Sequence, residues 1–135
     1  LEFEMRQPGG SHSVIEAQTF DTDDQGMATI ELTSLVYGQP YEFSAKGFSH
    51  LRETIPSLVL TETTSTIDFT YDNTFFLLAG DMHPSKDNFV NSLDISTLLN
   101  DLMTGERVSD LNNDSQVNSL DITIVLANLS KFGDQ

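Results

Sequence analysis

The segment VNSLDIS at residues 90–96 recurs as VNSLDIT at residues 117–123, 27 positions later. Each copy follows a run rich in Asp and Asn, and each opens a stretch in which apolar residues recur at helical spacing. A repeat that joins spaced carboxylates to an apolar helix face is typical of a duplicated cation-binding unit. The repeat therefore predicts two similar loop–helix elements, each built around a cation.

The apolar residues of each copy predict two amphipathic helices. They recur at i, i+3, i+4 and i+7, the spacing that lines one face of an α-helix. Gly105 lies in the short connection between the helices, where it can end the first of them. The predicted stripes are Ile95, Leu98, Leu99 and Leu102 in the first helix and Ile122, Val125, Leu126 and Leu129 in the second.

Residues 110–121 match the calcium loop of the EF-hand, in which oxygen ligands alternate along the chain. Calcium takes about six to eight oxygen ligands, and this spacing brings such ligands around one point. Ser115 stands where the loop usually has Gly, and position 12 is Asp rather than Glu. The predicted ligands, at positions 1, 3, 5, 7, 9 and 12, are Asp110, Asn112, Asp114, the Gln116 carbonyl, Asn118 and Asp121.

The loop before the first helix is less regular, but it also predicts a calcium ion. Without a gap His83 would stand at position 1, where an imidazole is a poor calcium ligand. Asp81 is chemically better and implies a loop that is two residues longer around Pro84, so either residue could start the loop, and we favour Asp81. The predicted ligands are Asp81, Ser85, Asp87, the Phe89 carbonyl, Asn91 and Asp94, with the His83 carbonyl as a possible further donor.

Residues 1–79 alternate apolar and polar side chains, the period of half-buried β-strands. Turn-forming runs such as residues 21–26 separate the strands, and this pattern predicts an all-β sandwich. The expected strands are residues 1–6, 12–20, 27–33, 41–45, 58–60 and 67–71. The change of period after Gly80 predicts a domain boundary, with the sandwich at 1–79 and a small helical domain at 80–135.

The composition excludes several classes of function. The net charge of -15 opposes binding to nucleic acids and to anionic lipid surfaces. The chain has no cysteine and no apolar run long enough to span a bilayer. The three histidines, His12, His50 and His83, are scattered and match no catalytic motif. We therefore expect a protein that is not an enzyme.

The repeat resembles a type I dockerin, a calcium-loaded module that docks enzymes onto the cohesin domains of scaffold proteins. The likeness rests on residues 80–81, 87–94 and 110–121, which match two F-hand loops, that is, EF-hand loops without the entering helix. The longer first loop, the missing loop glycines and the short linker depart from the family pattern. The resemblance implies two Ca²⁺ ions and a cohesin partner that contacts positions 10 and 11 of each loop. Those positions are Ser92, Leu93, Ser119 and Leu120, and the two leucines could instead be core residues at the helix starts.

Residues 20–30 and 41–48 resemble the carboxypeptidase-regulatory-like domain, a transthyretin-like sandwich that serves as a spacer or interaction platform. The expected fold class is therefore an immunoglobulin/transthyretin-like sandwich followed by a small all-α dockerin with two F-hand calcium loops. The expected function is calcium-dependent docking of an extracellular protein or polysaccharide-degrading enzyme to a cohesin-bearing, cellulosome-like scaffold. The alternative is a calcium-rigidified stalk or adhesin segment of a surface protein, whose sandwich could bind carbohydrate.

Overall fold

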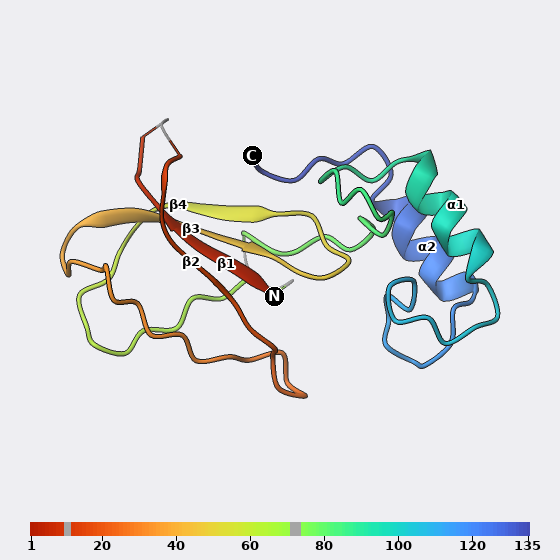
Figure 1. Ribbon diagram of the computed structural model, residues 1–135, viewed down its shortest axis with the longest axis horizontal. Coiled ribbons are helices and arrows are strands. Elements are labelled where there is room, and N and C mark those ends of the chain that lie inside the picture. Colours follow the sequence, from red (N-terminus) through yellow and green to blue (C-terminus); the bar gives the residue numbers. More distant parts are fainter. Residues whose placement is uncertain (10–11, 71–73) are drawn as a thin grey trace. The chain divides into compact units, whose positions relative to one another are not determined.

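A computed structural model describes residues 1–9, 12–70 and 74–135 of the chain. Its contacts divide into two compact units (Figure 1). The first unit comprises residues 1–46 and 53–76, and the second comprises residues 47–52 and 77–135. Each unit has its own cluster of buried apolar side chains.

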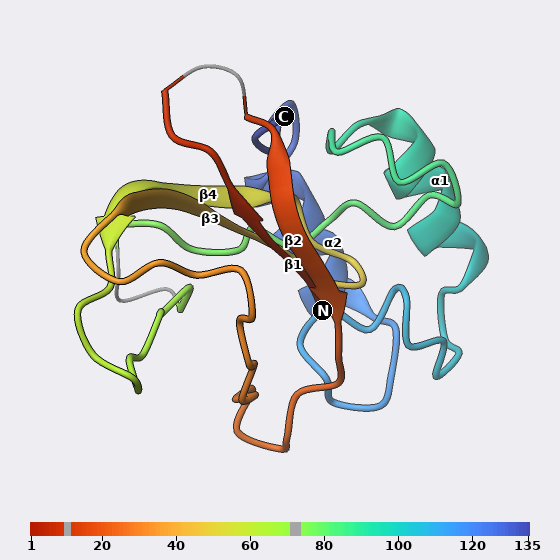
Figure 2. The same ribbon diagram turned by 60° about the vertical axis from the view of Figure 1, so that its left-hand side comes forward.

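The first unit is built on one antiparallel sheet of four strands in the order β2-β1-β3-β4 (Figure 2). Its central strands, β1 and β3, pair so that Met5 lies opposite Phe43. Phe3 and Phe43 stack with ring centroids 5.8 Å apart. The strand bounds are Glu2–Arg6 for β1, Val14–Thr19 for β2, Pro40–Lys46 for β3 and Glu53–Val59 for β4.

In the described part of the chain, irregular segments and not a second sheet cover the apolar side chains of this sheet. The buried cluster consists of Phe3, Met5, Tyr41 and Phe43. Half-buried residues packed against the cluster come partly from connecting segments, and those are Phe20, Ile30, Leu32, Leu35, Leu60 and Ile67. Ile30 and Leu32 thus serve the core, as their alternation suggests, but they reach it from a loop, whereas Met27 is 60% exposed.

The predicted strand at residues 27–33 is wrong, because its backbone is held by side chains of β2. Glu16 accepts hydrogen bonds from the main-chain N–H groups of Ser34 (2.9 Å) and Thr33 (3.1 Å). Gln18 donates from its side-chain amide to the carbonyl of Glu31 (2.7 Å). Such contacts satisfy backbone groups that would otherwise join a strand ladder.

The predicted strand at residues 67–71 is also wrong over its described part, residues 67–70, and Tyr71 lies outside the described residues. The Asp68 carboxylate accepts a hydrogen bond from the main-chain N–H of Thr70 at 2.8 Å. A carboxylate that bonds the backbone two residues on forms a local turn, which competes with strand pairing.

The second unit contains two helices of equal length, α1 at Ser92–Asn100 and α2 at Ser119–Ala127 (Figure 1). Both predicted helices are confirmed, although each begins three residues and ends two residues earlier than its apolar stripe. Asn91 and Asn118 are the N-caps, and each accepts a hydrogen bond from a backbone N–H of the first turn. Asp94 and Asp121 complete a capping box in each helix.

The core of the second unit includes a residue from the connection between β3 and β4. Leu51, only 2% exposed, is buried in the same cluster as the helix residues Leu98 and Val125. The main-chain N–H of Leu51 donates to the Leu78 carbonyl at 2.7 Å, and the N–H of Gly80 donates to the Ser49 carbonyl at 2.8 Å. Residues 47–52 are therefore an integral part of this unit, although they lie far from the helices in sequence.

The predicted fold class, an immunoglobulin/transthyretin-like sandwich followed by a small all-α dockerin, is wrong. The described chain has a single four-stranded sheet and two short helices. The sandwich fails because two of its expected strands are loops held by side-chain contacts. The all-α domain fails because the helical unit consists mostly of loops and takes residues 47–52 from between two strands. The boundary predicted between residues 79 and 80 stays a prediction.

Candidate functional site

The loop before α2 is closed by hydrogen bonds from its backbone to its own acidic side chains. The Asp110 carboxylate accepts from the main-chain N–H groups of Asp114 (3.1 Å) and Ser115 (2.8 Å). The Asp114 carboxylate accepts from the N–H of Gln116 (2.9 Å), and the Asn112 side-chain oxygen also accepts from the N–H of Asp114. Through these bonds the backbone of residues 110–116 bends around the side-chain oxygens of the loop.

Asp121 ties the two ends of this loop together from the first turn of α2. Its side chain is completely buried. One carboxylate oxygen accepts from the N–H groups of Leu111 (2.7 Å) and Asn112 (3.3 Å), and the other accepts from the N–H of Asn118 (2.8 Å). Burial of a carboxylate is tolerated here because backbone donors serve both of its oxygens.

The loop before α1 repeats this pattern around Asp94, which is also completely buried. One oxygen of Asp94 accepts from the N–H groups of Met82 (2.7 Å) and His83 (2.8 Å), and the other accepts from Asn91 (2.9 Å). Met82 and His83 are thus the counterparts of Leu111 and Asn112, so the residue before them, Asp81, is the counterpart of Asp110.

A second pair of contacts supports the same register. The N–H of Asn88 donates to the Asp81 carboxylate at 3.2 Å, as that of Ser115 donates to Asp110 at 2.8 Å. Asn88 and Ser115 both have a positive φ, 61° and 70°, at the bend where Gly is usual. In this geometry the first loop starts at Asp81, and His83 corresponds to the third loop position.

The extra length of the first loop lies between its third and fifth positions. Lys86 and Asn113 both have a positive φ just before the aligned residues Asp87 and Asp114, so Pro84 and Ser85 are the insertion. The Ser85 hydroxyl bonds the His83 ring at 2.9 Å and is exposed. The predicted ligand Ser85 therefore lies in the inserted part of the loop.

The other predicted ligands of the two loops match one another contact by contact. The side-chain amide of Asn91 donates to Asp87 (3.2 Å) and to the Phe89 carbonyl (3.3 Å). In the second loop Asn118 donates to Asp114 and to the Gln116 carbonyl at the same two distances, 3.2 and 3.3 Å. The 27-residue repeat is therefore a repeat of geometry as well as of sequence.

The donor set of both loops fits a hard cation such as calcium, because it consists of carboxylate, amide and carbonyl oxygens. The side-chain amide of Asn112, and further donors from Gln116 and Asn118, hold the pKa of Asp114 below its ordinary value. Among the described residues no group of three or more His, Cys, Asp or Glu side chains is placed to hold a metal. That finding concerns four residue types, whereas these loops also use Asn side chains and main-chain carbonyls.

The helix starts present a pair of exposed leucines. Leu93 is 46% exposed and Leu120 is 56% exposed, at matching positions of α1 and α2. Core packing, the alternative for these residues, does not account for this exposure. Ser92 and Ser119 precede them and are exposed as well. Between the helices lies a shallow apolar groove lined by Ile95, Leu98, Leu99, Ile122, Val125 and Leu126.

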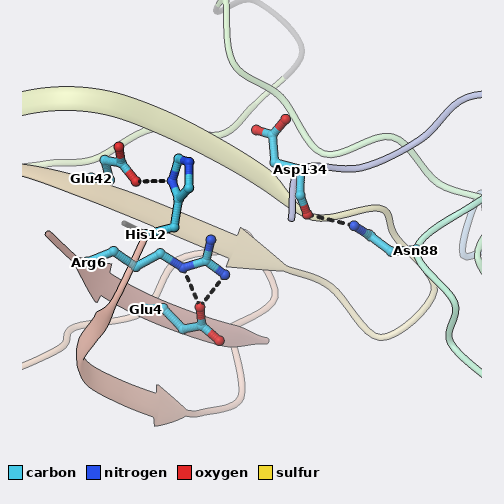
Figure 3. A network of polar contacts seen from close by, with 6 residues as sticks. All are labelled: Glu4, Arg6, His12, Glu42, Asn88 and Asp134. Atoms are coloured by element: carbon cyan, nitrogen blue, oxygen red, sulfur yellow. Dashed lines mark hydrogen bonds and ion pairs between the residues drawn. The ribbon is translucent and has the colours of Figure 1, made fainter. Parts of the chain in front are cut away.

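One set of contacts at the first loop was not found from the sequence. The Asn88 side chain accepts from the N–H of Arg52 (2.7 Å) and donates to the carbonyl of Asp134 (2.7 Å; Figure 3). The N–H of Gly133 donates to the Asn88 carbonyl at 3.0 Å, and the rings of Phe89 and Phe132 stack 4.0 Å apart. No local sequence signal joins residues this far apart in the chain.

The three histidines are not gathered into one site. His12 bonds the buried Glu42 carboxylate at 2.8 Å in the first unit (Figure 3). His83 bonds Ser85, and burial together with the nearby charge of Lys86 lowers the pKa of His50. The expectation that the chain is not an enzyme stays a prediction.

No helix in the described part of the chain combines the length and apolar character that a membrane crossing requires. No known protein family and no curated protein sequence matches the chain. The comparison with solved structures, in contrast, finds a similar fold.

Two matches are interface mutants of a type II cohesin–X–dockerin complex from Acetivibrio cellulolyticus. A chain of the C-terminal interface mutant matches with a TM-score of 0.61 and 22% identity, over 97% of this chain and 82% of its own length. A chain of the N-terminal interface mutant matches with a TM-score of 0.55 and 21% identity, over 74% and 67%. The sheet and the helices thus recur together within one solved chain, in agreement with the corrected fold class. This chain is similar in fold to chains of solved cohesin–dockerin complexes.

Proposed function

We propose that this chain is a calcium-dependent docking module that binds a cohesin domain through the helix starts of its second unit. The observation that carries the proposal is the pair of loops with the same hydrogen-bond pattern, each followed by an exposed leucine. An exposed apolar side chain on a rigid helix start is a natural anchor for a partner protein. Two such anchors at matching positions form one candidate surface.

Calcium is proposed as the ion that fixes this surface. In the second loop Asp110, Asn112, Asp114, the Gln116 carbonyl and Asp121 would hold it, with Asn118 acting through water because its side-chain oxygen already caps α2 at 2.8 Å. In the first loop Asp81, Asp87, the Phe89 carbonyl and Asp94 take the corresponding places, with Asn91 in that of Asn118. When bound, calcium supplies the positive charge that clustered carboxylates need at close range.

The nature of the partner is inferred from the structural neighbours, which come from cohesin–dockerin complexes. Those complexes are of type II, whereas the loop motifs resemble type I dockerins, so the test must include cohesins of both types. A cohesin partner implies an extracellular location and a parent protein held on a cellulosome-like scaffold. The first unit would then be a spacer or an interaction platform.

The test of this proposal is binding of the whole chain to a panel of type I and type II cohesins, measured by calorimetry with calcium and with chelator. We expect at least one cohesin to bind in calcium and none in chelator. Isolated dockerins belong in the same panel, because binding to a dockerin in place of a cohesin would assign the chain the opposite role. No binding to any cohesin at saturating calcium would favour the stalk or adhesin alternative.

The docking surface itself is tested with the double variant Leu93→Asp/Leu120→Asp. Loss of both anchors should weaken cohesin binding by about 30-fold or more. Val36→Asp, at a first-unit residue that is 58% exposed, is the matched control and should bind normally. Unchanged affinity of the double variant would place the partner elsewhere on the molecule.

A further inference from the structure

Apart from the insertion, the two loops differ in charge at one residue, Lys86. It stands at the fourth position of the first loop, where the second loop has the neutral and exposed Asn113. Both residues have a positive φ, 46° for Lys86 and 58° for Asn113, so the backbone takes the same bend. The difference between the loops at this position is therefore one of charge.

The Lys86 side chain is directed back onto its own loop. Its ammonium donates to the carbonyl of Asp81 at 3.0 Å and to the carbonyl of Phe48 at 2.8 Å. It also lies 4.9 Å from the centre of the Phe48 ring, within the range of a cation–π contact. Burial lowers the pKa of His50, and the charge of Lys86 adds to this shift.

A fixed ammonium at this place has two electrostatic consequences. It reduces the mutual repulsion of the loop carboxylates Asp81, Asp87 and Asp94 when no metal is bound. It also reduces the attraction of the same carboxylates for calcium, because affinity in such loops follows the net charge of the ligand set. The second loop has the same number of ligand carboxylates, and the corresponding residue brings no positive charge.

Hydrogen bonds between uncharged groups also fix the first loop to chain segments outside it. Asn88 at its bend is bonded to Arg52, Gly133 and Asp134. A Cβ added at Gly133 would lie 2.3 Å from the Asn88 side-chain oxygen, so these segments meet closely. At the bend of the second loop Ser115 is exposed, and a Cβ on the neighbouring Gly105 would approach its carbonyl only to 3.3 Å.

From these observations we infer that the Lys86 ammonium is a built-in counter-cation that keeps the first loop folded without calcium. The second loop, which has no such charge at the matching position, is then the half of the docking face that responds to calcium. This inference rests on the proposed function, since it assigns regulation by calcium to one of its two loops. Chelation unfolds the loop before α2 and leaves the loop before α1 in place.

The inference is tested with Lys86→Met in the whole chain, which removes the charge and keeps most of the apolar stem. Asp110→Ala, added to the same chain, disables the second loop so that calorimetry reports calcium binding to the first loop alone. Lys131→Met, at an exposed lysine of the same unit, is the matched control for the loss of one positive charge. Lys86→Gln, which keeps a donor without charge, serves if the Met variant does not fold.

Two opposite effects of one substitution are expected. Removal of the Lys86 charge should raise the calcium affinity of the first loop roughly tenfold relative to Lys131→Met. In chelator the same substitution should lower the melting temperature more than Lys131→Met does. A residue that merely supports the fold would lower stability without strengthening calcium binding.

The outcomes separate this inference from the docking function. If neither neutral variant binds calcium more tightly at the first loop than the control does, the inference is overturned, whether or not a cohesin binds. If the first loop binds no calcium in any variant, it is overturned as well. A chain that shows both expected effects and binds no cohesin contradicts the docking function and leaves the role of Lys86 standing.

Discussion

At the scale of single residues, the second unit depends on a few polar groups that are buried with their partners already in place. Asp94 and Asp121 are completely buried and receive backbone donors on both oxygens. His50 is different, because its ring nitrogen Nδ1 is buried and has no hydrogen-bond partner. Its protonation state therefore bears directly on stability.

We expect the stability of the chain to fall as the pH drops through the range in which histidines titrate. Burial, with Lys86 as a second cause, lowers the pKa of His50 in the folded state. The unfolded chain thus takes up a proton first, near the ordinary histidine pKa of about 6.5, and unfolding becomes easier below that pH. Above it both states are neutral at this residue and the contribution vanishes.

Urea unfolding at a series of pH values between about 5 and 8 measures this dependence. His50→Gln should flatten the curve over that range, because its side chain does not titrate. An equal slope in wild type and in His50→Gln would show that another group is responsible.

At the scale of elements, the sequence predicts what is determined locally. Both helices could be predicted because their apolar spacing, their caps and the repeat all lie within short segments. The same reasoning places Asp110 to Asp121 in one loop. The prediction of strands failed for residues 27–33 and 67–70. Apolar and polar residues do alternate there, but side chains of Glu16, Gln18 and Asp68 bond the backbone in place of a neighbouring strand. Periodicity reports which side chains are buried and does not say which backbone groups pair.

The two N-caps give a quantitative test of the repeat. Asn91 and Asn118 accept hydrogen bonds from Leu93 (2.7 Å) and Leu120 (2.8 Å), so replacement of either by Ala should cost about 0.5–2 kcal/mol of unfolding free energy. Measurement in saturating calcium keeps both loops folded, so that the two losses can be compared. Similar losses in the two variants would support the geometric equivalence of the loops, and a loss confined to one would contradict it.

At the scale of the whole molecule, sequence order and structural units do not coincide. The chain leaves the first unit after β3, contributes residues 47–52 to the core of the second, and returns to form β4. Leu51 was not recognised as a core residue of the helical unit because nothing near it in sequence resembles the repeat. Its packing, like the contacts of Asn88 with Arg52 and Asp134, is set by chain segments that are distant in sequence.

We therefore expect residues 80–135 alone to fail to fold as they do in the whole chain, even in saturating calcium. The fragment lacks Leu51, and it lacks the Ser49 hydroxyl, which bonds the Val108 carbonyl at 2.8 Å. In the whole chain Leu51→Ala should cost about 2–5 kcal/mol through the cavity it leaves. Leu99→Ala, at a residue that is 53% exposed, should cost clearly less. Circular dichroism and amide NMR spectra of the fragment in calcium decide the question, since a native-like fragment would show that residues 47–52 are dispensable.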